Sequence, residues 1–81
     1  MELKLDQKIV LELKEKGYNV EEMKRIIFDE LMEYDFEGSQ LFDLFFEHNG
    51  EQMLAQGKVG ENGVARCYGV FTSIMVIESE Q

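Results

Sequence analysis

Two Asn-Gly pairs in the second half of the chain restrict the fold more than any other feature of the sequence. They are Asn49–Gly50 and Asn62–Gly63, and each separates two segments that contain apolar residues. A type I′ turn requires positive φ at both central residues, and Asn followed by Gly adopts that conformation readily. We therefore predict an antiparallel meander of three strands over residues 40–47, 52–59 and 64–78. A helical continuation is the alternative for the first of these segments.

An amphipathic helix is predicted before the meander, over residues 20–34. Asn19 is a favourable N-cap, and Glu22 stands three residues later, as in a capping box. One side of this helix collects the apolar side chains Val20, Met23, Ile27, Leu31 and Tyr34. The opposite side carries Glu22, Arg25, Asp29 and Glu33. We therefore expect a largely acidic stripe that faces solvent.

The beginning of the chain is compatible with either a strand or a helix. Apolar residues occupy most odd positions from Met1 to Leu13, and charged residues occupy most even ones, which is the alternation of a strand. The Leu, Lys and Glu content favours a helix, however, and Ile9 with Leu13 has the spacing of one helical face. Gly17 after a lysine is typical of a helix end. We predict a helix near residues 6–16 and keep a strand as the alternative.

These elements together predict an α+β fold, with two N-terminal helices followed by the three-stranded antiparallel meander in one domain of residues 1–81. Large aromatic side chains dominate the cores of small domains, so the core is expected to contain Phe28, Phe36, Phe42, Phe45, Phe46 and Phe71. A domain of 81 residues buries only roughly 60% of its unfolded surface, so dimerisation would stabilise it. The last predicted strand is apolar on both sides. A homodimer is therefore a candidate assembly, with an interface formed by Val70, Phe71, Ile74 and Val76.

The charge is concentrated in one part of the chain. The net charge is −9, and residues 26–57 contain eight carboxylates and no Lys or Arg. Self-repulsion on this scale lowers stability, so it points either to solubility or to a positively charged partner. Direct binding to nucleic acid is not expected, because phosphate contacts need Lys and Arg. We predict a partner-binding surface that consists of Glu22, Asp29, Glu30, Glu33, Asp35, Glu37, Asp43 and Glu47.

No catalytic set can be assembled from these residue types. His48 is the only His and Cys67 the only Cys, so a soft-metal site or a His-based triad within one chain is excluded. Gly57–Lys58 is followed by Val59 where a P-loop needs Ser or Thr, which excludes that phosphate-binding motif. We therefore expect a protein that is not an enzyme and that needs no cofactor.

A calcium loop is only half present after the predicted helix. Glu33, Asp35 and Glu37 followed by Gly38 reproduce the first half of an EF-hand loop, but Leu44 stands where a bidentate Glu is required. We therefore predict no true metal site. Weak association of a divalent ion with Asp35 and Glu37 is left open.

The sequence also predicts where the protein acts. No apolar run is long enough to span a membrane, and the first residues lack the basic and apolar regions of a signal peptide. A single Cys suits a reducing compartment. We expect a cytoplasmic protein with no membrane partner.

In size, charge and compactness the chain is similar to small acidic proteins, many of them phage-encoded, that mimic the charge of DNA. Anti-CRISPR proteins and restriction inhibitors are of this type. The resemblance rests on general character and aligns no site residue. It implies a non-enzymatic inhibitor that occupies the basic groove of a nucleic-acid-binding protein. The alternatives are a homodimeric structural or adaptor protein whose acidity serves solubility, and a divalent-ion-responsive module that uses Asp35 and Glu37.

Overall fold

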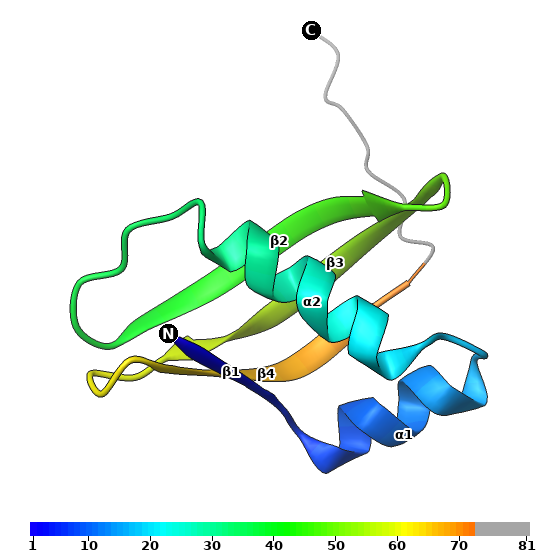
Figure 1. Ribbon diagram of the computed structural model, residues 1–81, viewed down its shortest axis with the longest axis horizontal. Helices are drawn as coiled ribbons and strands as arrows, with labels where there is room; N and C mark the ends of the chain where they lie inside the picture. The colour runs from blue at the N-terminus through cyan, green and yellow to red at the C-terminus, as the bar shows by residue number, and fades with distance from the viewer. Residues whose placement is uncertain (73–81) are drawn as a thin grey trace, which may run out of the picture.

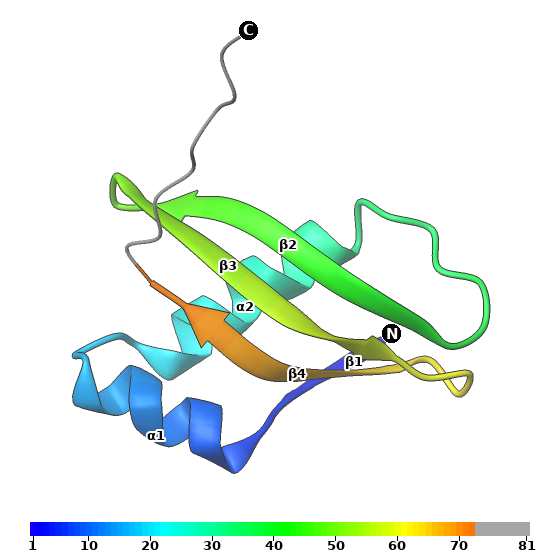
Figure 2. The same ribbon diagram turned by 180° about the vertical axis from the view of Figure 1, so that it is seen from behind.

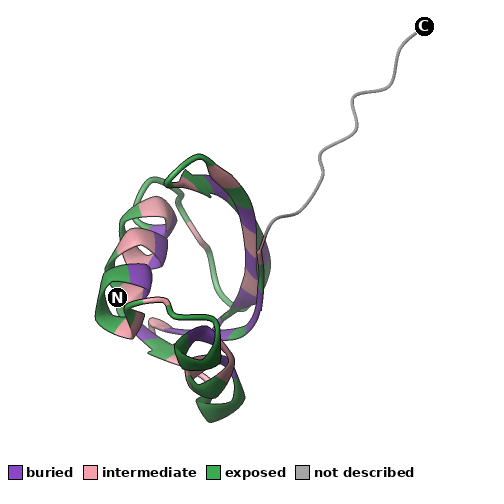
Figure 3. Ribbon diagram, turned by 90° about the vertical axis from the view of Figure 1, so that its right-hand side faces the viewer, coloured by how far each residue is buried: buried purple, intermediate pink, exposed green. Residues whose placement is uncertain are grey.

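Four strands form one sheet in the order β1-β4-β3-β2; α2 crosses one of its faces, and α1 lies beside the β1/β4 edge (Figure 1). The computed structural model describes residues 1–72. In chain order the elements are β1 (Glu2–Leu5), α1 (Gln7–Glu15), α2 (Val20–Leu31), β2 (Gln40–His48), β3 (Glu51–Val59) and β4 (Val64–Phe71). Seen from the side, α2 and the sheet are two layers with buried residues between them, and α1 lies at their lower end (Figure 3). The protein is therefore an α+β fold, as the sequence predicts.

The predicted meander of β2, β3 and β4 is confirmed, and the helical alternative for residues 40–47 is wrong. The turn between β2 and β3 has φ of 53° at Asn49 and 79° at Gly50, the positive values that a type I′ turn needs. The second turn differs from the expectation, because within it only Gly63 has positive φ. Its loop is closed by the backbone N–H of Gly60, which donates to the carbonyl of Val64 at 2.9 Å.

The first segment corrects the prediction in two ways. It contains a strand and a helix in succession, so a strand precedes the helices and the sheet has four strands instead of three. β1 pairs in parallel with β4, and its Leu3 is buried in the core. β1 and β4 lie about sixty residues apart, and parallel pairing between distant segments leaves no local signal in the sequence. The strand alternation and the helical spacing of Ile9 and Leu13 therefore look like alternatives for a single segment. Each describes its own element, since Ile9 and Leu13 are the buried residues of α1.

The predicted end of α1 and the predicted start of α2 are both confirmed. Gly17 has φ of 86°, and the N–H of Tyr18 donates to the carbonyl of Leu13 at 2.9 Å, which is the Schellman arrangement that ends α1. The side chain of Asn19 accepts a hydrogen bond from the N–H of Glu22 at 3.0 Å and so caps α2. α2 ends at Leu31, three residues earlier than predicted.

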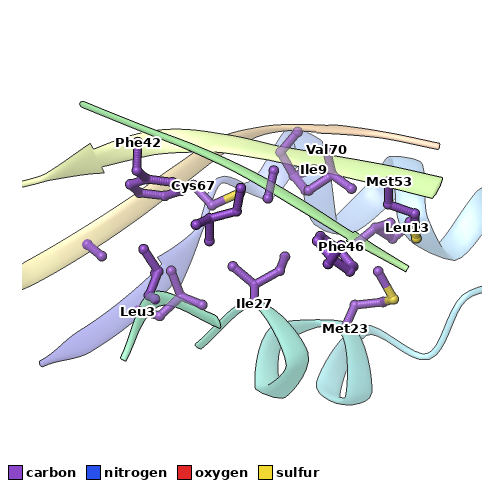
Figure 4. Packing of buried hydrophobic residues seen from close by; sticks show 14 of the residues in the cluster. Leu3, Ile9, Leu13, Met23, Ile27, Phe42, Phe46, Met53, Cys67 and Val70 are labelled. Carbon is purple, nitrogen blue, oxygen red and sulfur yellow. The ribbon is translucent and has the colours of Figure 1, made fainter. Parts of the chain in front are cut away.

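The core lies between the helices and one face of the sheet (Figure 4). α2 contributes Met23, Ile27 and Leu31, while β2 contributes Phe42, Leu44 and Phe46. The expectation that every Phe lies in the core is wrong for two of them, because Phe45 and Phe71 point away from the helices and are 60% and 48% exposed. They lie on the face of the sheet that the helices of residues 1–72 leave uncovered, which Figure 2 presents to the viewer.

Two of the four predicted dimer-interface residues are described, and they lie in different environments. Val70 is buried in the core, and Phe71 lies on the uncovered face of the sheet. Ile74 and Val76 lie outside the described residues, as does the predicted continuation of the last strand to residue 78. Within the described part, β4 is an interior strand between β1 and β3.

Candidate functional site

Five carboxylates gather on the C-terminal part of α2 and on the loop that follows it. We call them the acidic surface: Asp29, Glu30, Glu33, Asp35 and Glu37. Because α2 turns its apolar residues toward the sheet, Asp29 and Glu33 face solvent. Glu30 is half-buried, and the two loop carboxylates are exposed. Of the predicted stripe, Glu22, Arg25 and Asp29 are exposed on this helix, whereas Glu33 is exposed beyond the end of the helix at Leu31.

No side chain of the acidic surface forms an ion pair with any residue of the described part of the chain. An ion pair within residues 1–72 joins Arg66 Nη1 and Asp6 Oδ1 at 3.5 Å, on other elements. The last turn of α2 contains no basic residue. A helix C-terminus carries partial negative charge, so carboxylates there lower the free energy of unfolding. No ion pair of the described residues therefore offsets the unfavourable interaction of these carboxylates with the helix end.

The other three residues of the predicted partner-binding set lie elsewhere. Glu22 is in the first turn of α2, about 10 Å along the helix axis from Asp29, and Arg25 stands between them. Asp43 and Glu47 are on β2 and point to the uncovered face of the sheet, opposite the helices. The eight residues thus do not form one continuous surface. The structure brings together the five of the acidic surface.

The two carboxylates of the loop after α2 do not belong to a metal-binding cluster of the described residues. Asp35 and Glu37 are exposed on the segment between α2 and β2. In the part of the chain that the structure describes, no three His, Cys, Asp or Glu side chains lie where they would share a metal ion. Nothing in the described geometry therefore favours the ion-responsive alternative.

The remaining reactive groups take part in packing. Cys67 is buried, and this burial raises the pKa of its thiol above the usual value, so the thiolate that a nucleophile needs is disfavoured. The hydroxyl of Tyr18 donates to Glu51 Oε1, and this hydrogen bond is the main reason why the pKa of Tyr18 is raised. The ring of His48 lies 6.2 Å from the ring of Tyr18. Tyr18, Glu51 and His48 thus connect the turn before α2 to the β2–β3 end of the sheet.

A second surface lies on the side of the sheet away from the helices (Figure 2), and of the residues on it only Phe71 was part of the predicted dimer interface. We call it the open face; its large apolar side chains are Leu41, Phe45, Leu54, Tyr68 and Phe71. A signal was available in β2, where Phe42, Leu44 and Phe46 already supply the buried side. The intervening Leu41 and Phe45 must then face the other way, because side chains alternate along a strand.

Comparison with known proteins adds no family to this description. No protein-family model, curated protein or solved structure matches the chain. Neither helix of residues 1–72 has the length and apolar character needed to cross a membrane. The two surfaces described above are therefore the basis for a functional proposal.

Proposed function

We propose that this protein is a non-enzymatic binding module whose acidic surface docks on a basic surface of another protein. The partner we favour is a nucleic-acid-binding protein, whose basic groove the module would occupy as an inhibitor. The observation that carries this proposal is the clustering of Asp29, Glu30, Glu33, Asp35 and Glu37 at the negative end of α2, without a cationic partner in residues 1–72. Phage-encoded DNA mimics such as anti-CRISPR proteins, which the chain resembles in size and charge, act in this way.

The mechanism is competition for a site built for phosphates. A groove lined by Lys and Arg attracts the acidic surface over roughly the Debye length, about 8 Å at physiological ionic strength. This attraction accelerates association and makes it sensitive to salt. Once docked, each carboxylate takes the place of a phosphate as an acceptor for Lys and Arg donors. Nucleic acid is then excluded because the same cations are occupied.

A capture experiment with paired variants tests the proposal. Tagged wild type is compared with Asp29→Lys/Glu33→Lys, which reverses two charges on the acidic surface. The matched control is Glu12→Lys/Glu15→Lys, which makes the same change in net charge on α1, away from the acidic surface. Nuclease-treated lysate removes proteins that are bridged by nucleic acid. Capture should persist with wild type and the control and should be lost with the first variant.

Two outcomes of this experiment would contradict the proposal. Equal capture by both variants would show that the acidic surface is only a solvated face. Loss of capture by both would show that net charge alone matters, which also contradicts a defined docking surface. Binding measured on the recovered protein at several salt concentrations then separates specific docking from weak general attraction.

A structural or adaptor role remains the second candidate, because the open face exposes apolar side chains that a solitary module does not need. The surface that would serve this role is on the other layer of the molecule from the acidic surface. The two roles are therefore compatible in one protein.

A further inference from the structure

An apolar row crosses the open face from strand to strand. Phe45 on β2 is the partner of Leu54 on β3, which in turn is the partner of Phe71 on β4. Tyr68 on β4 is exposed near this row, whereas the exposed Leu41 is separated from it by the Asp43–Gln56 pair and is the partner of Lys58. Contiguous exposed apolar patches are uncommon on monomeric proteins and mark sites of association. The row is therefore the centre of a candidate interface.

The charges that the strands place on the open face balance each other. They comprise Lys4, Lys58 and Arg66 as cations and Glu2, Asp43 and Glu47 as carboxylates. With Asp6, the ion-pair partner of Arg66, included, the face carries three cations and four carboxylates, so it is nearly neutral in a chain whose net charge is −9. The acidic surface lies on the helical layer, on the other side of the molecule (Figure 3). Two copies can therefore bring their open faces together without pressing their acidic surfaces against each other.

The cations of the open face form a row of their own. Lys58 on β3 is the partner of Arg66 on β4, and Arg66 is the partner of Lys4 on β1. Like charges at neighbouring cross-strand positions destabilise a sheet, and the ion pair of Arg66 with Asp6 relieves only part of this. Beside the row is a hollow of about 310 Å³, lined by Lys58, Gly60, Asn62, Val64, Arg66 and Tyr68. The arrangement suits acidic side chains that arrive from outside the chain.

Such side chains are present on the same face, at its opposite edge. Asp43 and Glu47 are on β2, the edge strand farthest from β1. A two-fold axis in the plane between two facing sheets exchanges the positions of the β2 carboxylates and the cationic row. Each pair of opposite charges then meets twice, which is the self-complementarity that an isologous interface requires.

We propose that the open face is the interface of a homodimer in which two copies pack sheet against sheet. Strands about 4.8 Å apart with about 3.3 Å per residue give the face a projected area on the order of 400–500 Å². Standard interfaces bury about 800 Å² of accessible surface per partner, so the face supplies at least about half of that area. A nearly neutral face suits a second copy better than nucleic acid, which needs an excess of cations. This inference is independent of the proposed function, and the dimer would present two acidic surfaces outward.

The first test is the oligomeric state of the full chain by sedimentation velocity across micromolar concentrations. Wild type should be a dimer, and Phe45→Glu should raise the dimer dissociation constant at least about 30-fold, the size expected for a central aromatic residue. The control is Leu11→Glu on α1, since Leu11 is 53% exposed on the helical layer and should leave the dimer intact. A monomeric wild type would overturn the proposal. This holds also if residues 73–81 of the same chain, and not a second copy, cover the open face. A dimer that Phe45→Glu leaves unchanged would also overturn it.

The second test exchanges the charges. One variant is Lys4→Glu/Lys58→Glu, which leaves Arg66 and its ion pair in place, and the other is Asp43→Lys/Glu47→Lys. Each should dimerise more weakly than wild type, whereas an equimolar mixture should form heterodimers with nearly wild-type affinity. The second variant is decisive because it reduces the negative net charge of the chain from −9 to −5. If general repulsion governed association, it would dimerise more tightly, and that result would contradict charge complementarity across the open face.

Discussion

Reversing two charges at the end of α2 should make the domain more stable. Asp29 is in the last turn of the helix, and Glu33 lies two residues beyond its end at Leu31. Both are exposed, and neither has an ion-pair partner in residues 1–72. Lysine at either position places positive charge at the negative end of the helix dipole. The same variant that should lose a partner, Asp29→Lys/Glu33→Lys, should therefore gain stability.

The magnitude follows from the position and exposure of the two side chains. A charge near a helix terminus contributes about 0.3–1 kcal/mol at low ionic strength, with exposed groups at the lower end. Reversal at each of the two positions removes an unfavourable contribution and adds a favourable one. The like-charge i,i+4 pair adds nothing to the gain, because two lysines repel each other as two carboxylates do. The variant should therefore be more stable than wild type by about 1 kcal/mol. For a domain of this size that corresponds to a rise in Tm of about 4–8 °C.

Urea unfolding at low and at high salt checks this reasoning. The neutral variant Asp29→Gln/Glu33→Gln should show more than half of the gain. It removes the unfavourable interaction with the helix end and the repulsion between the two carboxylates, without adding attraction. The gain should shrink in about 1 M salt, where the Debye length is about 3 Å. A gain of the same size at both salt concentrations would mean that helix propensity, not charge, is responsible. An unchanged or lower stability at low salt would refute the electrostatic account.

Three further predictions concern the fold, each checked by urea unfolding monitored by circular dichroism. Gly57→Ala should destabilise by about 1–3 kcal/mol, because an added Cβ would collide with the ring of Phe42 and a backbone carbonyl of β4, whereas unchanged stability would contradict this packing. Asn19→Ala should cost about 1 kcal/mol through loss of the α2 cap, and Asn19→Asp should retain most of it. Burial raises the pKa of Cys67, so the native state holds this proton more tightly; the stability it confers is complete below the unfolded pKa of about 8.5 and is lost as the pH rises above it. Cys67→Ala should lack that part of the alkaline decline.

Local chemistry predicted much of the fold. The Asn49–Gly50 turn, the Asn19 cap and the glycine end of α1 each depend on residues within a few positions of one another, and all three are present. β1 was not separated from α1, because its partner β4 lies about sixty residues away and parallel pairing has no turn that links the strands. The end of α2 was placed three residues too late, since the apolar pattern runs on to Tyr34.

The candidate site was predicted less completely than the fold. Exposure of Asp29 and Glu33 follows from helical periodicity, so that part of the acidic surface was visible in the sequence. Asp43 and Glu47 were grouped with it because they are close in the chain, but strand alternation sends them to the other face. Phe45 was assigned to the core on its residue type alone. Which face of β2 the helices cover is decided by tertiary packing, and that choice separates the acidic surface from the open face.

The rate at which the acidic surface associates with its partner tests the central claim most directly. Stopped-flow mixing with the captured protein gives the association rate constant as a function of salt. For wild type and for Glu12→Lys/Glu15→Lys it should fall steeply as salt rises, whereas for Asp29→Lys/Glu33→Lys it should be low and nearly independent of salt. Equal rates and equal salt dependence for all three proteins would contradict the claim that these carboxylates bind the partner.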